Sequence, residues 1–433
     1  MTSRRSRRTR ARALVAAAVV LAVSTTAACS SAQSGAATNS TLTVVTVNPF
    51  TGQDGPFGPE QAAGCQAAAT AINAAGGVLT HTVACTSADT LGNPADAVTA
   101  AANMLATTSR LFGVLGPSSD EADSTAPLLD AANIPMFADT GEGSFDHTNL
   151  QYFWRMTAAD DAQGDAMALY AHRKGYLRGA AVFADNVGSQ TSVPTLRKAY
   201  RALGGTMVLN QKITLGKTSY LPEVEQLIAA HPQVIFTEAS PQANAILFAE
   251  LQQQGHLIPI IGTDGTTQPQ WLTAVTDAIG KPALSQHFVA VQPYAAPSGA
   301  AWQVYNKNLL ASASVSKPAQ WSTDSYTMTA YDGVIVMALA ATLTKSTDPA
   351  VFNTDVMAVT EPGPHKQPVT SFAAGKAALA AGKQIQYVGA AGTILFHQWH
   401  NANGGFGIVA YQTNGNLNLV ASITAADLAP LIK

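Results

Sequence analysis

The sequence predicts an α/β protein with two Rossmann-like lobes, each built around a parallel sheet. Short apolar runs alternate with longer segments of helical spacing, which is typical of parallel strands covered on both faces by helices. This rhythm runs through the first part of the chain and begins again after about residue 160. About 390 residues follow the N-terminal segments, too many for one typical hydrophobic core.

The elements of the first unit follow from the hydrophobic pattern. We expect strands at 42–47, 80–86, 111–115 and 134–138, and helices at 58–75, 94–106 and 120–132. A Gly-rich, acidic loop at 139–146 precedes an extended segment at 152–156. The second unit repeats the plan, with helices at 161–174, 191–203, 221–230 and 242–254 and strands at 179–184, 206–213, 234–237 and 258–262.

The C-terminal third is less regular. A strand is expected at 288–294 and helices at 299–311 and 325–343, followed by an irregular, Pro-bearing excursion at 351–375. The last part is predicted to be a β-ribbon formed by 392–396, 407–411 and 417–423, with turns at Asn403-Gly404 and Asn414-Gly415.

The N-terminus predicts export. Six arginines precede an apolar segment at 13–23 and a small-residue exit, the pattern of a secretory signal peptide over residues 1–28. The exit Thr26-Ala-Ala-Cys29 resembles the lipobox of bacterial lipoproteins, in which Cys29 would carry the lipid; a Tat-type route is the alternative. Residues 29–40 are small and polar and are expected to form a flexible tether.

Charge excludes one class of partner. Removing residues 1–28 takes away six of the 24 basic residues (Lys and Arg) and none of the 27 acidic residues, which leaves a net charge of about −9. An acidic body argues against nucleic acid. We expect no later apolar run to be long enough to span a bilayer, so that membrane attachment depends on Cys29.

Two cysteines remain once Cys29 is assigned to lipid. In an exported protein, the even pair Cys65 and Cys85 is suited to a disulfide between a helix and the strand that follows it. Two buried free thiols are the alternative.

The stretch 111–129 joins a strand to a helix through Gly116-Pro117-Ser118-Ser119. We expect its two hydroxyls and the free N–H groups of the helix start to offer a site for an anion. The alternative is that Ser118 or Ser119 only caps the helix.

Short motifs in a fixed order carry a family resemblance. They are Asn48-Pro-Phe-Thr-Gly52 with Phe57-Gly58, Ala71-Ile-Asn-Ala-Ala-Gly-Gly77, Gly116-Pro-Ser-Ser119, Ile134-Pro135, Tyr152-Phe-Trp-Arg155, Asp160-Asp-Ala-Gln-Gly164, Ile260-Ile-Gly-Thr-Asp-Gly265, Ala330-Tyr-Asp332 and Gly392-Thr-Ile-Leu-Phe396. Together they resemble the type I periplasmic solute-binding proteins of ABC importers, in particular the branched-chain amino acid (leucine/isoleucine/valine)-binding branch.

The resemblance implies two lobes joined by a hinge of three crossovers. Lobe 1 would comprise 41–154 and about 295–405, and lobe 2 would comprise 155–290 and about 406–433. The segments 152–156 and 288–294 and the ribbon at Gly407 fit the three crossovers. A ligand that bridges both lobes would stabilise the closed state.

The resemblance also implies ligand contacts. Ser118 and Ser119 stand where the family holds the ligand carboxylate, Phe57 where an aromatic ring covers the ligand, and Asp264 where an acid pairs with the α-ammonium group. These three agreements favour an amino-acid-like zwitterion.

Two loops depart from the family pattern. Asp139-Thr140-Gly141-Glu142 replaces small and hydroxyl residues, and Ala239-Ser240 stands where the family often has an aromatic side chain. We take Thr140, Glu142, Glu238 and Ser240 as further candidate ligand contacts. Carboxylates of Glu142, Glu238 and Asp264 in one cleft would favour a cationic, amine-rich or hydroxylated solute. The alternative is that Glu142 and Glu238 point to solvent from mobile loops.

No constellation in the sequence predicts an enzyme, a cofactor or a metal site. Leu215-Gly-Lys-Thr218 lacks the first glycine of a P-loop, and His397 and His400 have no third ligand nearby in sequence. Ser118 is not in a nucleophile elbow.

We therefore expect a monomeric, lipid-anchored solute-binding protein on the outer face of the bacterial cell membrane. It would capture a small polar solute with amino-acid features, or a related amine, and deliver it to ABC permease subunits. The alternative is a sensor or regulator of the same fold that is not coupled to transport.

Overall fold

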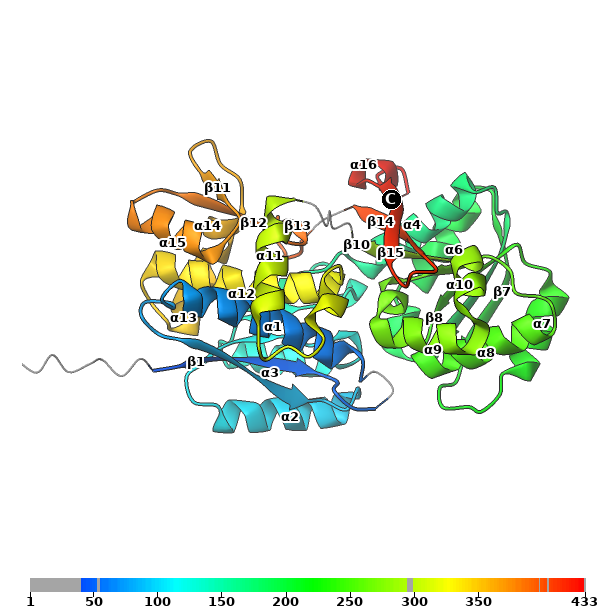
Figure 1. The fold of residues 1–433 in the computed structure, drawn as a ribbon, viewed down its shortest axis with the longest axis horizontal. Coiled ribbons are helices and arrows are strands. Elements are labelled where there is room, and N and C mark those ends of the chain that lie inside the picture. Colours follow the sequence, from blue (N-terminus) through cyan, green and yellow to red (C-terminus); the bar gives the residue numbers. More distant parts are fainter. Residues whose placement is uncertain (1–39, 53–54, 294–298, 397, 403–404, 432–433) are drawn as a thin grey trace, which may run out of the picture. The chain divides into compact units, whose positions relative to one another are not determined.

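The computed structural model describes residues 40–52, 55–293, 299–396, 398–402 and 405–431 (Figure 1). The predicted signal peptide, the lipid site at Cys29 and nearly all of the tether lie outside the described residues, as do His397 and the predicted turn at Asn403-Gly404.

The first sheet has five strands in the order β2-β1-β3-β4-β5. They are β1 (Leu42–Asn48), β2 (Val83–Asp89), β3 (Leu111–Leu115), β4 (Met136–Ala138) and β5 (Phe153–Arg155), and all are parallel. One face packs on α1 (Phe57–Ala74) and α12 (Ser325–Thr344), and the other on α2 (Pro94–Thr107) and α3 (Ser119–Ala131). α11 (Ala300–Ala311) packs on α1 (Figure 1).

α12 corrects one expectation from the sequence. It is 20 residues long and apolar enough to cross a bilayer by length and composition, but 83% of its most apolar window is buried inside the protein. Apolar side chains all around the helix are typical of a core helix that is covered on every side. α12 is therefore the central helix of this lobe.

The second sheet has seven strands in the order β15-β14-β10-β9-β8-β6-β7. They are β6 (Arg178–Ala184), β7 (Thr206–Ile213), β8 (Val234–Glu238), β9 (Ile260–Gly262), β10 (Phe288–Pro293), β14 (Phe406–Tyr411) and β15 (Leu417–Ile423). α4 (Asp160–Arg173) and α6 (Val193–Ala202) cover one face. α7 (Leu221–Ala230), α8 (Pro241–Gln253), α9 (Pro269–Ile279) and α10 (Lys281–His287) cover the other.

The chain passes between the two sheets after β5, after β10 and before β14. Two of the segments expected to be crossovers are strands of the second sheet. Residues 288–293 pair with β9 and β14, and residues 406–411 pair with β10 and β15. The passages lie next to these strands, because apolar runs such as these are buried in a sheet and not exposed at a hinge.

Residues 349–393 form an ordered module where the sequence predicted an irregular excursion. It comprises α13 (Pro349–Phe352), α14 (Val356–Thr360), α15 (Phe372–Ala380) and the sheet β11 (Gln367–Val369), β12 (Ile385–Gly389), β13 (Gly392–Thr393), drawn in yellow to orange in Figure 1. β13 pairs with β12, so the prediction that 392–396 joins the final ribbon is wrong. The elements are too short to show clear periodicity, yet Phe352, Val356 and Phe372 are buried in the core beside α12.

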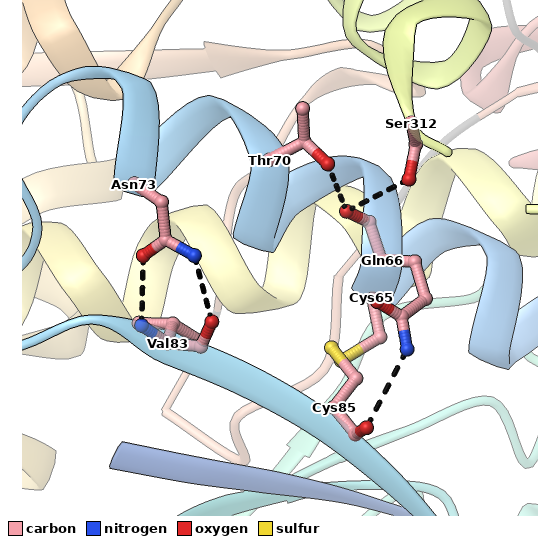
Figure 2. Close-up of a disulfide and its surroundings, with 7 residues drawn as sticks. All are labelled: Cys65, Gln66, Thr70, Asn73, Val83, Cys85 and Ser312. Atoms are coloured by element: carbon pink, nitrogen blue, oxygen red, sulfur yellow. Dashed lines mark hydrogen bonds between the residues drawn. A yellow bond between two sulfur atoms is a disulfide. The ribbon is translucent and has the colours of Figure 1, made fainter. Parts of the chain in front are cut away.

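A disulfide joins α1 to β2 (Figure 2). It links Cys65 and Cys85, so the alternative of two free thiols does not apply. The side chain of Asn73 makes a second link, exchanging two 2.8 Å hydrogen bonds with the backbone of Val83. These links fix α1, whose first residue is the candidate contact Phe57, against the edge of the first sheet.

The helix expected at 191–203 begins later than predicted. A separate turn, α5 (Val187–Gln190), precedes it, and the Asn186 side chain caps this turn by accepting a hydrogen bond from the Ser189 N–H. Gly188 and Ser189 of α5 line the candidate pocket.

Candidate ligand-binding pocket

One pocket lies where the carboxyl ends of strands from both sheets meet. Its walls come from the loops after β3 and β4 in the first sheet and after β8 and β9 in the second, and its volume is about 810 Å³ with open solvent included. Open α/β sheets bind ligands at such strand ends. Six of the predicted contacts line it: Phe57, Ser118, Ser119, Glu238, Ser240 and Asp264.

Thr140 and Glu142 are not among the lining residues. Thr140 lies within hydrogen-bond distance of Ser119, with 3.1 Å between the two hydroxyl oxygens. Glu142 is 3% exposed, and burial raises the pKa of its carboxyl to about 8. Glu238 also faces the pocket. The alternative in which both glutamates point to solvent from mobile loops is therefore wrong.

Asp264 and Glu238 form the acidic wall of the second sheet. Asp264 accepts hydrogen bonds from the Gln163 side-chain amide (2.9 Å) and the Gly265 N–H (3.1 Å). Glu238 accepts from the hydroxyls of Thr263 (2.6 Å) and Ser189 (3.2 Å). Burial raises the pKa of Asp264, and burial together with Asp264 and Asp160 raises the pKa of Glu238 to about 8. Neutral donors orient these acids but do not neutralise them.

Ser118 and Ser119 lie at the start of α3, and neither acts as the predicted helix cap. Ser118 occupies the capping position, but its side chain makes no hydrogen bond to the helix backbone. Its hydroxyl donates to the carboxylate of Glu121, which also accepts a hydrogen bond from Thr90 at 2.5 Å. The anion site expected here therefore already contains a carboxylate of the protein itself.

Asp139 is an acid of the pocket that the sequence did not nominate. It follows β4 directly and lines the pocket, yet it is only 7% exposed, and its Oδ1 has no hydrogen-bond partner among the described residues. Burial, with Glu121 and Asp264 nearby, raises the pKa of Asp139 to about 8. Its position at a strand tip was a usable signal, because the carboxyl ends of parallel strands face the ligand.

Two further residues line the pocket. Asp160 lines it from the start of α4, and burial raises the pKa of its carboxyl to about 7. Tyr326, at the start of α12, packs edge-on against Phe57 with 6.3 Å between ring centroids. No local pattern signals Tyr326, since it arrives from a helix far along the chain.

Contacts across the pocket tie the two walls together. The carboxylate of Asp120 in α3 accepts hydrogen bonds from the Gly188 N–H (2.6 Å) and the Asn186 side chain (3.0 Å), both near α5. On the other side, Gln268 lies 3.4 Å from the carboxylate of Glu60. These contacts join the first sheet's helices to loops of the second sheet, so the pocket walls are held together in this conformation.

Two α/β lobes around a pocket at their strand ends define a clamshell of the kind that binds small molecules. The chain belongs to the periplasmic binding protein family, whose family model matches residues 41–416. This confirms the family predicted from the motifs, and with it the two-lobed α/β fold.

Relatives and solved structures agree with this assignment. The chain is 25% identical over 245 residues to the Leu/Ile/Val-binding protein BraC3 of Rhizobium johnstonii, which covers 56% of this chain and 66% of the relative. An amino acid binding protein of Pseudomonas aeruginosa is 26% identical over 55% of this chain and 65% of its own length. The chain thus spans about two thirds of the length of the curated relatives that it matches.

The fold resembles that of a leucine-binding protein, LivK, from Thermotoga maritima, with a TM-score of 0.70 and 19% identity over 89% of this chain and all of that one. LivJ from Streptococcus pneumoniae, solved with isoleucine, has the same TM-score at 17% identity over 89% of this chain and 99% of its own. A solute-binding protein from R. palustris, solved with 4-hydroxybenzoate, reaches 0.69 at 17% identity over 90% of this chain and 99% of its own.

Proposed function

We propose that this chain is a lipid-anchored, extracytoplasmic solute-binding protein of an ABC importer, which captures a small polar solute bearing an ammonium group. The observation that carries the proposal is the pocket at the strand ends, with acids from both sheets in its walls. The family supports the capture of solutes outside the cytoplasm, and the names of the relatives favour an amino-acid-like compound.

Asp264 is the proposed partner of the solute's ammonium group. It is 6% exposed, lines the pocket, and is held in place by Gln163 and Gly265. A protonated amine would replace the missing positive charge and make charge-assisted hydrogen bonds. Phe57 and Tyr326 would pack against the apolar part of the solute.

Capture would couple to closure of the two lobes. A solute that contacts both walls binds the closed state more tightly than the open state, and it shifts the population by that difference in affinity. The described link after β5, residues 156–159, joins the two sheets and is a natural place for a hinge. A permease that recognises the closed state would then receive the solute.

The test is a thermal-shift screen of the purified protein against amino acids, amines, amides, sugars and short peptides. A solute that binds only the folded form raises the melting temperature. We expect compounds with an ammonium group to give the largest shifts. If no small molecule in any class shifts the melting temperature, the capture proposal is wrong.

The first variant to test is Asp264→Asn. Loss of the charged partner is expected to weaken binding of an amine solute by about 1.5 kcal/mol or more, measured by calorimetric titration. Glu225→Gln, an exposed acid on α7 away from the pocket, is the matched control and should leave the affinity unchanged. Unchanged affinity in Asp264→Asn would remove the amino-acid model.

A further inference from the structure

The pocket has acidic side chains on both walls. Three acids come from the first sheet's helix and loop, and three from the second sheet's side: Asp120, Glu121, Asp139, Asp160, Glu238 and Asp264. The described lining residues include no Lys, Arg or His. An amino acid zwitterion would therefore place its own carboxylate among these acids, which is unfavourable in a partly desolvated site.

On the wall of the first sheet, one buried carboxyl oxygen has no donor among the described residues. Asp139 is 7% exposed and lines the pocket, and its Oδ1 has no hydrogen-bond partner among the described residues. A buried carboxylate without a partner is costly, and native proteins keep one mainly where something else supplies the missing donor. The free acceptor of Asp139 is thus a position for a donor from the solute.

On the wall of the second sheet, Asp264 and Glu238 accept hydrogen bonds only from neutral groups among the described residues. The donors to Asp264 are the Gln163 amide, the Gly265 N–H and the Tyr326 hydroxyl, and the donors to Glu238 are two hydroxyls. None of these groups is charged. The first wall therefore offers an unfilled acceptor at Asp139, and the second wall offers two carboxyl groups that only neutral donors hold in place. A protonated amine would make charge-assisted hydrogen bonds to either wall.

A bare metal ion does not suit this arrangement. Among the described residues, no three His, Cys, Asp or Glu side chains come close enough together to coordinate a metal ion. The acids are spread over opposite walls, and the aromatic pair Phe57 and Tyr326 also lines the space. Aromatic faces attract organic cations and pack against methylene groups. The expected occupant is longer than an ion and partly apolar.

We propose that the solute is a small organic dication, a linear diamine or a related compound with two protonated nitrogens and no carboxylate. One nitrogen binds at Asp139 and the other at Asp264 and Glu238, with the connecting methylenes against Phe57 and Tyr326. This inference rests on the proposed function, because it names the class of solute for the same pocket.

The decisive test compares three ligands with the same four-carbon chain. Calorimetric titration of the purified protein would use 1,4-diaminobutane, 1-aminobutane, which lacks the second charge, and 4-aminobutanoate, which replaces it with a carboxylate. The diamine is expected to bind at least about tenfold more tightly than either analogue, since it alone can make charge-assisted hydrogen bonds to both walls.

The matched variant is Asp139→Asn. It should weaken binding of 1,4-diaminobutane by about tenfold or more while leaving 1-aminobutane, held by the other wall, nearly unchanged. Glu225→Gln is the control and should change neither affinity. The comparison of ligands on the unmodified protein is decisive by itself if the variant does not fold.

The results separate this inference from the function on which it rests. Tighter binding of 4-aminobutanoate or leucine than of the diamine overturns the dication and leaves solute capture intact. Tighter binding of Mg²⁺ or Ca²⁺ overturns it as well. Failure of the diamine together with every compound of the wider screen overturns both. Equal loss of diamine and monoamine affinity in Asp139→Asn also contradicts the two-ended model.

Discussion

Asp332 and Asp139 are two buried aspartates in the same lobe with opposite surroundings. Asp332, in the middle of α12, is fully buried, and its carboxylate accepts hydrogen bonds from the Tyr387 hydroxyl (2.8 Å) and the N–H groups of Ala390 (2.8 Å) and Ala391 (2.9 Å). Asp139, at the tip of β4, is buried to a similar degree but has an acceptor without a donor.

The difference shows in the pKa values. Burial raises the pKa of both groups, but three donors hold the pKa of Asp332 at about 6, whereas the pKa of Asp139 rises to about 8. Burial alone therefore does not distinguish a structural acid from a ligand-binding acid. The supply of donors does, because a satisfied carboxylate has nothing to gain from a solute.

The largest expected effect concerns the structural acid. Asp332→Ala leaves the Tyr387 hydroxyl and two backbone N–H groups without an acceptor, and each such buried donor costs about 1–3 kcal/mol. We expect the free energy of unfolding in urea to fall by about 3 kcal/mol or more. Affinity for the solute should stay within about twofold, since Asp332 is not among the lining residues of the pocket.

This prediction has an internal control. Asp332→Asn keeps one oxygen acceptor for Tyr387 and Ala390, so its loss of stability should be smaller than that of Asp332→Ala. Equal stability of the alanine variant and the parent protein would mean that these hydrogen bonds do not anchor the 349–393 module to α12.

The parallel strands could be predicted to within about three residues at either end, because a strand buried on both faces is a continuous apolar run between turn signals. The module at 349–393 could not. Its helices and strands are short, and they are stable only because Tyr387 and its neighbours find Asp332 and the core beside α12. Such contacts are long-range and leave no local pattern.

The site was partly predictable, because its residues follow the predicted strands directly. Strand tips nominate Ser118, Glu238 and Asp264, and the structure brings all three to one pocket. The sequence could not show that Ser118 donates to Glu121, or that Asp139 lacks a donor, because hydrogen-bond partners are set by side-chain positions in the folded chain. Tyr326 was missed since it reaches the pocket from another part of the fold.

The next expected effect concerns Asp139, the proposed ligand contact, and it is a gain of stability instead of a loss. Asp139→Asn replaces a buried carboxyl by a neutral amide, so the unliganded protein should become more stable at pH 8, with a melting temperature about 2 °C or more above the parent. Asp332→Asn, the same change at the satisfied site, should lower it. If both asparagine variants, or neither of them, were more stable than the parent protein, the contrast between Asp139 and Asp332 would be wrong.

The pH window follows from the raised pKa of Asp139. Between the ordinary Asp pKa near 4 and the folded pKa of about 8, the folded state holds a proton that the unfolded state has lost. Stability of the parent therefore falls as pH rises through this range, and the gain from Asp139→Asn should grow from pH 4 to pH 8. Melting curves at several pH values measure it, and a gain that does not change with pH would contradict the assignment.

The smallest expected effect concerns Ser118. Its variant distinguishes two roles for the hydroxyl, binding a carboxylate of the solute or donating to the protein's own Glu121. Its hydroxyl donates to Glu121, so Ser118→Ala should cost about 1 kcal/mol or less in stability and change the affinity for 1,4-diaminobutane by less than about threefold. If Ser118 instead held a carboxylate of the solute, the same variant would lose about tenfold in affinity for an amino acid. Calorimetric titration of both ligands decides between these roles. If the parent protein binds leucine tightly and Ser118→Ala greatly weakens that binding, the zwitterion model is restored. The carboxylate of the solute would then lie at the start of α3.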